Sequence, residues 1–244
     1  MRKSRIEKLL PGAMQLAGVD AWVVVCRENA NDPLAAHVGD ENAGGTAAIL
    51  FLLKGNQVRS LAITPWGEAV GLRELAVHHE VISLDQPGDV WKTLAHQLRS
   101  AAPLRIAVNC SSRNIADGLS WSQRRELEKA LDEEMAERLV SSEVLMSEWL
   151  SVKLPAEVEI MRRAGALTVQ LQLEAYARVM PGKTRDSDVA RYIKDRMKEL
   201  GVGPAWSPDQ CSSVNSGFPR GHAGPSDKVI QPGDFIPTDF GIKA

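Results

Sequence analysis

The sequence predicts two domains, an α/β domain followed by an α+β domain. Over residues 1–148, β-branched strand patterns alternate with amphipathic helix patterns, which is typical of a mixed sheet with helices packed on its faces. From residue 149 onward, two long helix patterns come first and strand patterns follow. The 244 residues are 44% hydrophobic, which is sufficient for two separate cores. We therefore expect domains at residues 1–148 and 149–244.

The first domain is expected to alternate helices and strands along its whole length. Its helices are predicted over residues 4–17, 67–76, 89–100 and 121–137, and its strands over residues 21–26, 46–53, 57–63, 80–84, 104–109 and 138–145. Gly18 suits the end of the first helix, since glycine readily adopts the left-handed conformation. Gly55-Asn56 separates two strand patterns, which predicts a hairpin.

The second domain should begin with a pair of helices. Pro155 fits the first turn of a helix because its missing N–H would be unpaired there, and Pro181-Gly182 would end that helix. Thr184 is placed to cap a second helix, which Gly201 would end. Two strand patterns follow, over residues 210–214 and 234–241.

Charge and cysteine content exclude several classes of protein. The formal net charge is -2 and the charge runs mix both signs, so the chain has no basic face for nucleic acid or for an anionic membrane. Cys26, Cys110 and Cys211 are far apart and odd in number, which disfavours a disulfide framework and favours the cytoplasm. The N-terminal pattern is that of an amphipathic helix, not of a signal peptide.

The residues with the clearest chemistry lie between Val214 and Gly241. This stretch contains His222, then Pro232-Gly233, then a strand pattern that carries Asp239. Pro232-Gly233 fits the centre of a type II turn, which would start the strand and direct Asp239 inward. Without further context, the simplest interpretation of His222 is a surface loop residue, and that of Asp239 a solvated carboxylate at a strand end.

A metal site at Asp239 would be unfinished in this chain. Catalytic ions are generally held by three or more protein ligands, and only five residues follow Asp239. We therefore expect a chain that is truncated within its catalytic domain. Carboxylate oxygens beside imidazole suit Mn, Co or Zn, and the sequence does not select one of them.

The order of motifs from Trp149 to Gly241 resembles the pita-bread metallopeptidase family, which includes aminopeptidase P, prolidase, creatinase and, more distantly, methionine aminopeptidase. The motifs that carry this resemblance are Lys153, Pro155, Glu157, "MRRAG", "MPGKT", "VNSG", His222, "PGD" and "TDFG". The first half of the chain resembles the creatinase-type N-terminal domain. The resemblance implies a creatinase-like N-terminal α/β domain followed by an incomplete pita-bread catalytic domain, and metal-dependent hydrolysis of proline-containing peptides before proline.

The resemblance also assigns roles to two residues. His222 matches the catalytic histidine that contacts substrate and helps to move protons without binding metal. Asp239 matches the first carboxylate of a site for two divalent metal ions, whose other ligands would be an aspartate, a histidine and two glutamates. With those ligands missing, this chain is not expected to hold the metal pair stably. Pro237 departs from the usual apolar residue and should confine its stretch to a sheet edge or a bulge.

Two other functions stay open at this point. A creatinase-like C–N hydrolase would share the fold and His222 but would need neither metal nor Asp239. A non-catalytic binding or oligomerisation module would keep the fold without the site. Four apolar side chains of the first helix should pack on a sheet of which few strands are present, so we expect a homo-oligomer, a dimer or larger, or a disordered C-terminal half. These side chains are Ile160, Leu167, Leu171 and Val179.

Overall fold

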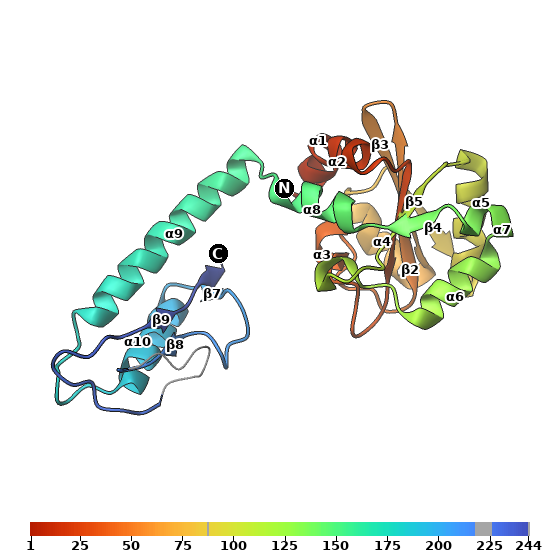
Figure 1. The fold of residues 1–244 in the computed structure, drawn as a ribbon. Helices are drawn as coiled ribbons and strands as arrows, with labels where there is room; N and C mark the ends of the chain where they lie inside the picture. The colour runs from red at the N-terminus through yellow and green to blue at the C-terminus, as the bar shows by residue number, and fades with distance from the viewer. Residues whose placement is uncertain (87, 218–225, 244) are drawn as a thin grey trace. The chain divides into compact units, whose positions relative to one another are not determined.

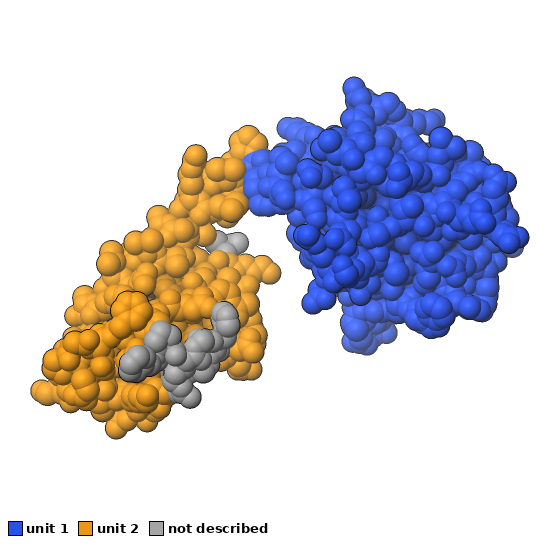
Figure 2. Space-filling model, viewed as in Figure 1, with its two compact units in different colours: residues 1–154 blue, residues 155–244 orange. Residues whose placement is uncertain are grey.

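The computed structural model describes residues 1–86, 88–217 and 226–243. These residues form two compact units, residues 1–154 and residues 155–244, coloured separately in Figure 2. Each unit has its own hydrophobic core. Across the described ranges, no helix combines the length and the apolar character needed to cross a membrane.

The first unit, drawn from red to green in Figure 1, is built on a six-stranded sheet. Its strand order is β4-β3-β2-β1-β5-β6. Strands β1, β2 and β3 pair antiparallel, whereas β4, β5 and β6 each join their neighbour in parallel. The strands are β1 (Ala21–Cys26), β2 (Ala47–Lys54), β3 (Gln57–Pro65), β4 (Glu80–Leu84), β5 (Ile106–Val108) and β6 (Leu139–Ser141).

Helices cover both faces of this sheet, so strand β1 is buried along its whole length. Alternate residues of β1 enter different cores, Trp22 and Val24 on one face and Val23 and Val25 on the other, as the period of two in a strand requires. The helices are α1 (Arg2–Lys8), α2 (Leu10–Ala17), α3 (Ala35–Val38), α4 (Trp66–Leu75), α5 (Asp89–Ala101), α6 (Trp121–Ala130), α7 (Glu133–Ala136) and α8 (Glu143–Ser151), with a 3-10 turn at Asn114–Ala116.

The sequence placed a strand over residues 138–145, but the structure ends β6 at Ser141 and begins helix α8 at Glu143. Ser142 fixes this change of direction, because its buried hydroxyl donates to Asn109 Oδ1 at 2.8 Å and its N–H donates to the Val108 carbonyl at 2.9 Å. The predicted helix over 121–137 is also two helices. Asp132 begins the second by accepting the Met135 N–H at 2.9 Å.

The two units meet at residues 154 and 155, whereas the sequence placed the second domain's start at residue 149. Trp149 is fully buried in the first unit, where its ring lies 5.5 Å from the Trp22 ring in an edge-on arrangement. Its indole N–H donates to the Arg5 carbonyl at 3.3 Å. Helix α8, which carries Trp149, is therefore part of the first unit's core.

Among its described residues, the second unit contains two helices and four very short strands. Strand β8 pairs antiparallel with β9, and β7 pairs antiparallel with β10. Its core consists mainly of one face of each helix together with Cys211, Val214 and Ile230. The elements are α9 (Pro155–Tyr176), α10 (Asp186–Glu199), β7 (Gly203–Pro204), β8 (Ser213–Val214), β9 (Thr238–Asp239) and β10 (Ile242–Lys243).

Helix α9 is buried only towards its C-terminal end. Leu171 and Ala175 belong to the core, whereas Ile160 and Met161 are 39% and 56% exposed. The helix ends at Tyr176, four residues before the predicted end at residue 180. The first half of α9 therefore presents apolar side chains that no described residue of this unit buries.

Candidate metal centre

The strand segment that carries Asp239 lies beside residues 213–217. Ser213 is paired with Asp239 and Val214 with Thr238. The contact continues past these two-residue strands, since the Asn215 N–H donates to the Pro237 carbonyl at 3.1 Å. Pro237 has no N–H to return a bond, so Asn215 and Pro237 share one backbone hydrogen bond and not two. The described sheet has two strands, β8 and β9, so Pro237, directly before β9, lies at a sheet edge, where a proline is tolerated.

A turn at Pro232-Gly233 begins this segment, as the sequence predicts. The Asp234 N–H donates to the Gln231 carbonyl at 3.1 Å, and Gly233 has a φ of 88°, as position i+2 of a type II turn requires. The Asp234 carboxylate accepts the Ser216 hydroxyl at 2.6 Å and the Gln231 N–H at 2.8 Å. The Ser216 bond and then the Gln231 bond lower the pKa of Asp234. This carboxylate therefore fixes the turn against residue 216.

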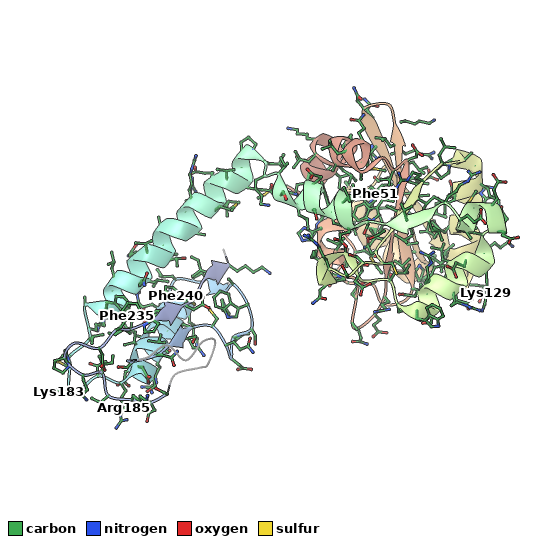
Figure 3. The ribbon with its side chains drawn as sticks, in the orientation of Figure 1. Phe51, Lys129, Lys183, Arg185, Phe235 and Phe240 are labelled. Carbon is green, nitrogen blue, oxygen red and sulfur yellow. The ribbon has the colours of Figure 1, made fainter. Side chains whose placement is uncertain are left out.

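Helix α9 positions the strand through its last residue. The Tyr176 hydroxyl lies 2.8 Å from Thr238 Oγ1 and 3.0 Å from the Ile236 carbonyl oxygen. Ile236 and Phe240 pack against the core of the unit, and Phe240 is labelled in Figure 3.

Asp239 lies between these inward positions and is exposed. The sequence predicts that Asp239 points inward. Side chains alternate between the two faces of a strand, however, so Asp239 points away from the core that Phe240 contacts. Its carboxylate is consequently accessible from solvent.

The second predicted site residue, His222, lies outside the described residues. The structure therefore does not describe how far His222 lies from Asp239. The catalytic role of His222 and the ligand role of Asp239 stay predictions.

A divalent metal pair does not fit the described residues by themselves. Within residues 1–86, 88–217 and 226–243, no three His, Cys, Asp or Glu side chains gather as a metal site. Asp234, the neighbouring carboxylate on the segment, is used by the turn. Asp239 is thus a single candidate ligand, and a catalytic ion generally needs three or more.

Sequence reasoning missed the carboxylate that organises this unit, Asp186. It is fully buried and accepts the Ser226 hydroxyl at 2.5 Å and the Ser226 and Lys228 N–H groups at 3.2 and 3.1 Å. Asp186 therefore joins the start of α10 to residues 226–228. An acidic residue in the first turn of a predicted helix was the available signal, but it is commonly explained by the helix dipole alone.

Thr184 is not the cap of α10, which the sequence expected. The helix begins after Arg185, whose N–H donates to Asp188 Oδ2 at 3.0 Å. Thr184 Oγ1 instead accepts the Met180 N–H at 2.9 Å and closes the preceding turn. Because the helix is capped one residue later than predicted, Thr184 belongs to the loop before α10.

Comparison with known proteins gives a family match for part of the chain and a fold match for nearly all of it. Residues 159–244 match the sequence model of metallopeptidase family M24. No curated protein matches the chain. Among solved structures, the chain is similar to an Xaa-Pro dipeptidase from Bacillus anthracis, with a TM-score of 0.65 and 21% identity over 98% of this chain and 60% of that one.

Two further solved structures agree. An X-Pro aminopeptidase from Thermotoga maritima MSB8 gives a TM-score of 0.64 at 22% identity and covers 94% of this chain and 60% of its own. A recombinant prolidase from Thermococcus sibiricus gives 0.57 at 16% identity and covers 96% and 60%. The chain thus spans 60% of the length of each of these three relatives.

At these identities the structural matches establish the fold, and the family match covers the segment that carries Asp239. The predicted α/β and α+β fold, creatinase-like in its first half and pita-bread in its second, is confirmed. The predicted family resemblance is confirmed as well: this chain has the fold of the pita-bread peptidases, and its residues 159–244 match metallopeptidase family M24.

Proposed function

We propose that this chain supplies the N-terminal domain and the first part of the catalytic domain of a metal-dependent peptidase that cleaves before proline, of the aminopeptidase P or prolidase type. One observation carries the proposal. The M24 match covers the Asp239 strand, in a chain that shares its fold over 98% of its length with an Xaa-Pro dipeptidase. Proline-containing peptides are the proposed substrates, and the cytoplasm is the proposed location.

In this proposal Asp239 is one ligand of a pair of divalent ions, Mn, Co or Zn, and His222 is the catalytic histidine. The exposure of Asp239 supports its role, because an ion would reach the carboxylate without displacing core residues. The other ligands would come from residues outside the described part of the chain. We therefore expect the 244-residue chain by itself to be inactive on Xaa-Pro peptides, because a lone carboxylate does not hold a catalytic ion.

Two assays test the proposal. The purified chain is incubated with an Xaa-Pro dipeptide and Mn, Co or Zn in turn, and no metal-stimulated cleavage is expected. A longer version that includes the remaining 40% of the relatives' length is then assayed in parallel, and metal-dependent turnover is expected there. Robust cleavage by the 244-residue chain, abolished by a chelator, would contradict the first expectation.

Variants of the longer version assign the roles. His222→Ala should lower turnover by about 100- to 10,000-fold while metal content stays unchanged. Asp239→Asn should lower both turnover and metal content, and Asp209→Asn, at another exposed aspartate, should change neither. If turnover needs no metal and survives Asp239→Asn, the creatinase-like C–N hydrolase is the better interpretation. If the longer version has no hydrolase activity at all, the binding-module interpretation replaces the enzyme.

A further inference from the structure

The strand that carries Asp239 is held in register by short backbone pairing. Among the described residues, strands β8 and β9 pair over two residues each. Beyond them, Pro237 accepts the Asn215 N–H and has no N–H to return a bond. A shift of one residue in a strand pairing moves every side chain to the opposite face. In a shifted register, Asp239 would face the core.

Apolar burial favours the observed register only weakly. Ile236 and Phe240 pack against the core in this register. A shift of one residue would turn Phe235 and Pro237 inward instead, and both are apolar as well. Phe235 is 70% exposed in the observed register, and Figure 3 labels Phe235 and Phe240. The charge of Asp239 opposes its burial, but a charge that avoids the core does not hold a strand in place.

Thr238 is the polar residue on the inward face of this segment, two residues after Ile236. Its Oγ1 lies 2.8 Å from the Tyr176 hydroxyl oxygen, and the same hydroxyl lies 3.0 Å from the Ile236 carbonyl oxygen. Tyr176 therefore contacts two alternate residues, one through its side chain and one through its backbone. In a shifted register the residue before or after Thr238 would take its place, and neither has the hydroxyl group that Tyr176 meets.

Tyr176 is itself fixed before it meets the strand. It is the last residue of α9, and its ring packs against the core of the unit. Gln172, one turn earlier, donates from Nε2 to the Tyr176 hydroxyl at 3.2 Å. Leu171 and Ala175 are buried at the same end of the helix. The hydroxyl is thus held by the buried end of α9, which makes it a fixed reference for the strand.

We propose that Tyr176 is a positioning residue that locks the register of residues 235–240 and keeps the Asp239 carboxylate on the outward face. Thr238 and the Ile236 carbonyl are the groups that it recognises. The lock is a property of the second unit of this chain. Its use in presenting a metal ligand rests on the function proposed above, whereas its existence is tested without any metal.

Backbone NMR of the full ¹⁵N,¹³C-labelled chain measures the register directly. The parent should show nuclear Overhauser contacts between residues 213 and 239 and between residues 214 and 238. Tyr176→Phe and Thr238→Val should each weaken these contacts and add contacts of a shifted pairing, between residue 213 and residue 238 or 240. The Asn215 N–H, which donates to Pro237, should exchange about 2- to 10-fold faster, as expected for the loss of one hydrogen bond.

Two NMR results would overturn the proposal. One is a set of unchanged contacts in Tyr176→Phe. The other is a loss of the contacts without any shifted pairing, which would mean that Tyr176 orders the strand but does not choose its register. Because Tyr176→Phe keeps the ring, this variant decides the result even if Thr238→Val fails to fold.

Two control variants separate the lock from a general loss of stability. Thr238→Ser keeps the hydroxyl group and should keep the parent contacts. Tyr192→Phe removes another tyrosine hydroxyl of the same unit, which donates to Glu174 at 3.1 Å, and should leave the contacts between β8 and β9 unchanged. If Tyr192→Phe altered those contacts as much as Tyr176→Phe, the effect would be one of stability and the lock would be refuted.

The longer version tests the consequence for the proposed site. Tyr176→Phe should weaken Mn²⁺ binding by about tenfold, because residues that orient a ligand contribute to metal affinity, and Tyr192→Phe should not. Equal Mn²⁺ affinity in the parent and in Tyr176→Phe would contradict the positioning role. A parent that binds no Mn²⁺ would instead overturn the proposed function, and the NMR contacts would still decide whether the lock exists.

Discussion

The two units reach a folded state in different ways. The first has a sheet covered on both faces, with strand β1 buried from end to end. The second has strands of two residues each and a 22-residue helix in which only Leu171 and Ala175 are buried. The second unit instead depends on side-chain hydrogen bonds, such as those that the carboxylates of Asp186 and Asp234 accept. The unit that matches the peptidase family is thus the one with less core of its own.

The largest expected effect of a single methyl group lies in the first unit, at Gly118. A Cβ atom built there would lie 2.0 Å from Asp32 Oδ2, which is buried and accepts Asn109 Nδ2 at 2.9 Å. Gly118→Ala should therefore break this buried network and destabilise the first unit by about 4 kcal/mol or more. Gly12→Ala, where an added Cβ meets nothing within 4 Å, should instead stabilise helix α2 by about 0.5–1 kcal/mol. Denaturant unfolding of both variants measures the contrast, and equal effects would contradict it.

Truncating one fully buried side chain in each unit should show which unfolding transition belongs to which unit. Leu50 of the first unit and Ile193 of the second are both fully buried. Leu50→Ala and Ile193→Ala should each cost about 2–5 kcal/mol, the first in the transition at higher denaturant and the second in the one at lower denaturant. Fluorescence and hydrogen exchange of the whole chain follow the two steps. A single shared transition, moved equally by both variants, would show that the units are equally stable and coupled.

Association of two or more copies of the chain would change the unfolding transition expected for the second unit. Ile160 and Met161 are exposed on α9, and contact with a second copy would cover them. We expect light scattering to give a dimer or larger assembly, in which Ile160→Lys lowers the apparent mass. A monomer whose second unit resists protease as well as its first would contradict the prediction made from the sequence.

The sequence predicts the first unit better than the second for a physical reason. Strands such as 21–26 and 80–84 carry their own signal, because burial on one or both faces demands a run or an alternation of apolar residues. Errors occurred where a tertiary contact decides, as at Ser142, whose bond to Asn109 turns a predicted strand into helix α8. In the second unit, Asp186 acts on residues forty positions away, which no local pattern reveals.

The candidate site follows the same rule. The turn at Pro232-Gly233 was predictable because proline and glycine determine its backbone angles. The exposure of Asp239 was not predictable, because it depends on which residues of the strand, here Ile236 and Phe240, meet the core of α9 and α10. Chemical identity is local information, whereas orientation depends on packing.

A smaller effect is the pH dependence of the first unit's stability. Because burial raises the folded-state pKa of Asp40 from 3.8 to about 6, the protonated form is the one the fold favours. Its stabilising contribution is complete below pH 3.8 and is lost as the pH rises through about 6, which amounts to about 3 kcal/mol at most. Asp40→Asn should remove this loss, so the variant gains stability relative to the parent at pH 7.5 and not at pH 4. Parallel thermal unfolding at both pH values measures the difference.

Titration of His78 changes the stability with pH in the opposite direction, so the pH dependence of the parent chain does not show the effect of Asp40 by itself. Burial lowers its folded-state pKa from 6.5 to about 4, so its contribution is present above pH 6.5 and is lost as the pH falls through about 4. The two residues partly cancel between pH 4 and 6.5. In Asp40→Asn the stability of the first unit should therefore rise with pH across this window. A pH profile of Asp40→Asn parallel to that of the parent would show that Asp40 does not titrate as described.

The smallest expected effects compare one helix start in each unit. Ser120 caps α6 in both directions, since its hydroxyl accepts the Gln123 N–H at 3.3 Å and Gln123 Oε1 accepts the Ser120 N–H at 3.0 Å. Ser120→Ala should therefore cost the first unit about 1 kcal/mol. Thr184 closes only the exposed turn at Met180 before α10, so Thr184→Ala should cost the second unit about 0.5 kcal/mol or less. Urea midpoints for the two transitions measure both values. A larger cost for Thr184→Ala than for Ser120→Ala would mean that Thr184 supports α10 after all, as its place in the sequence first indicated.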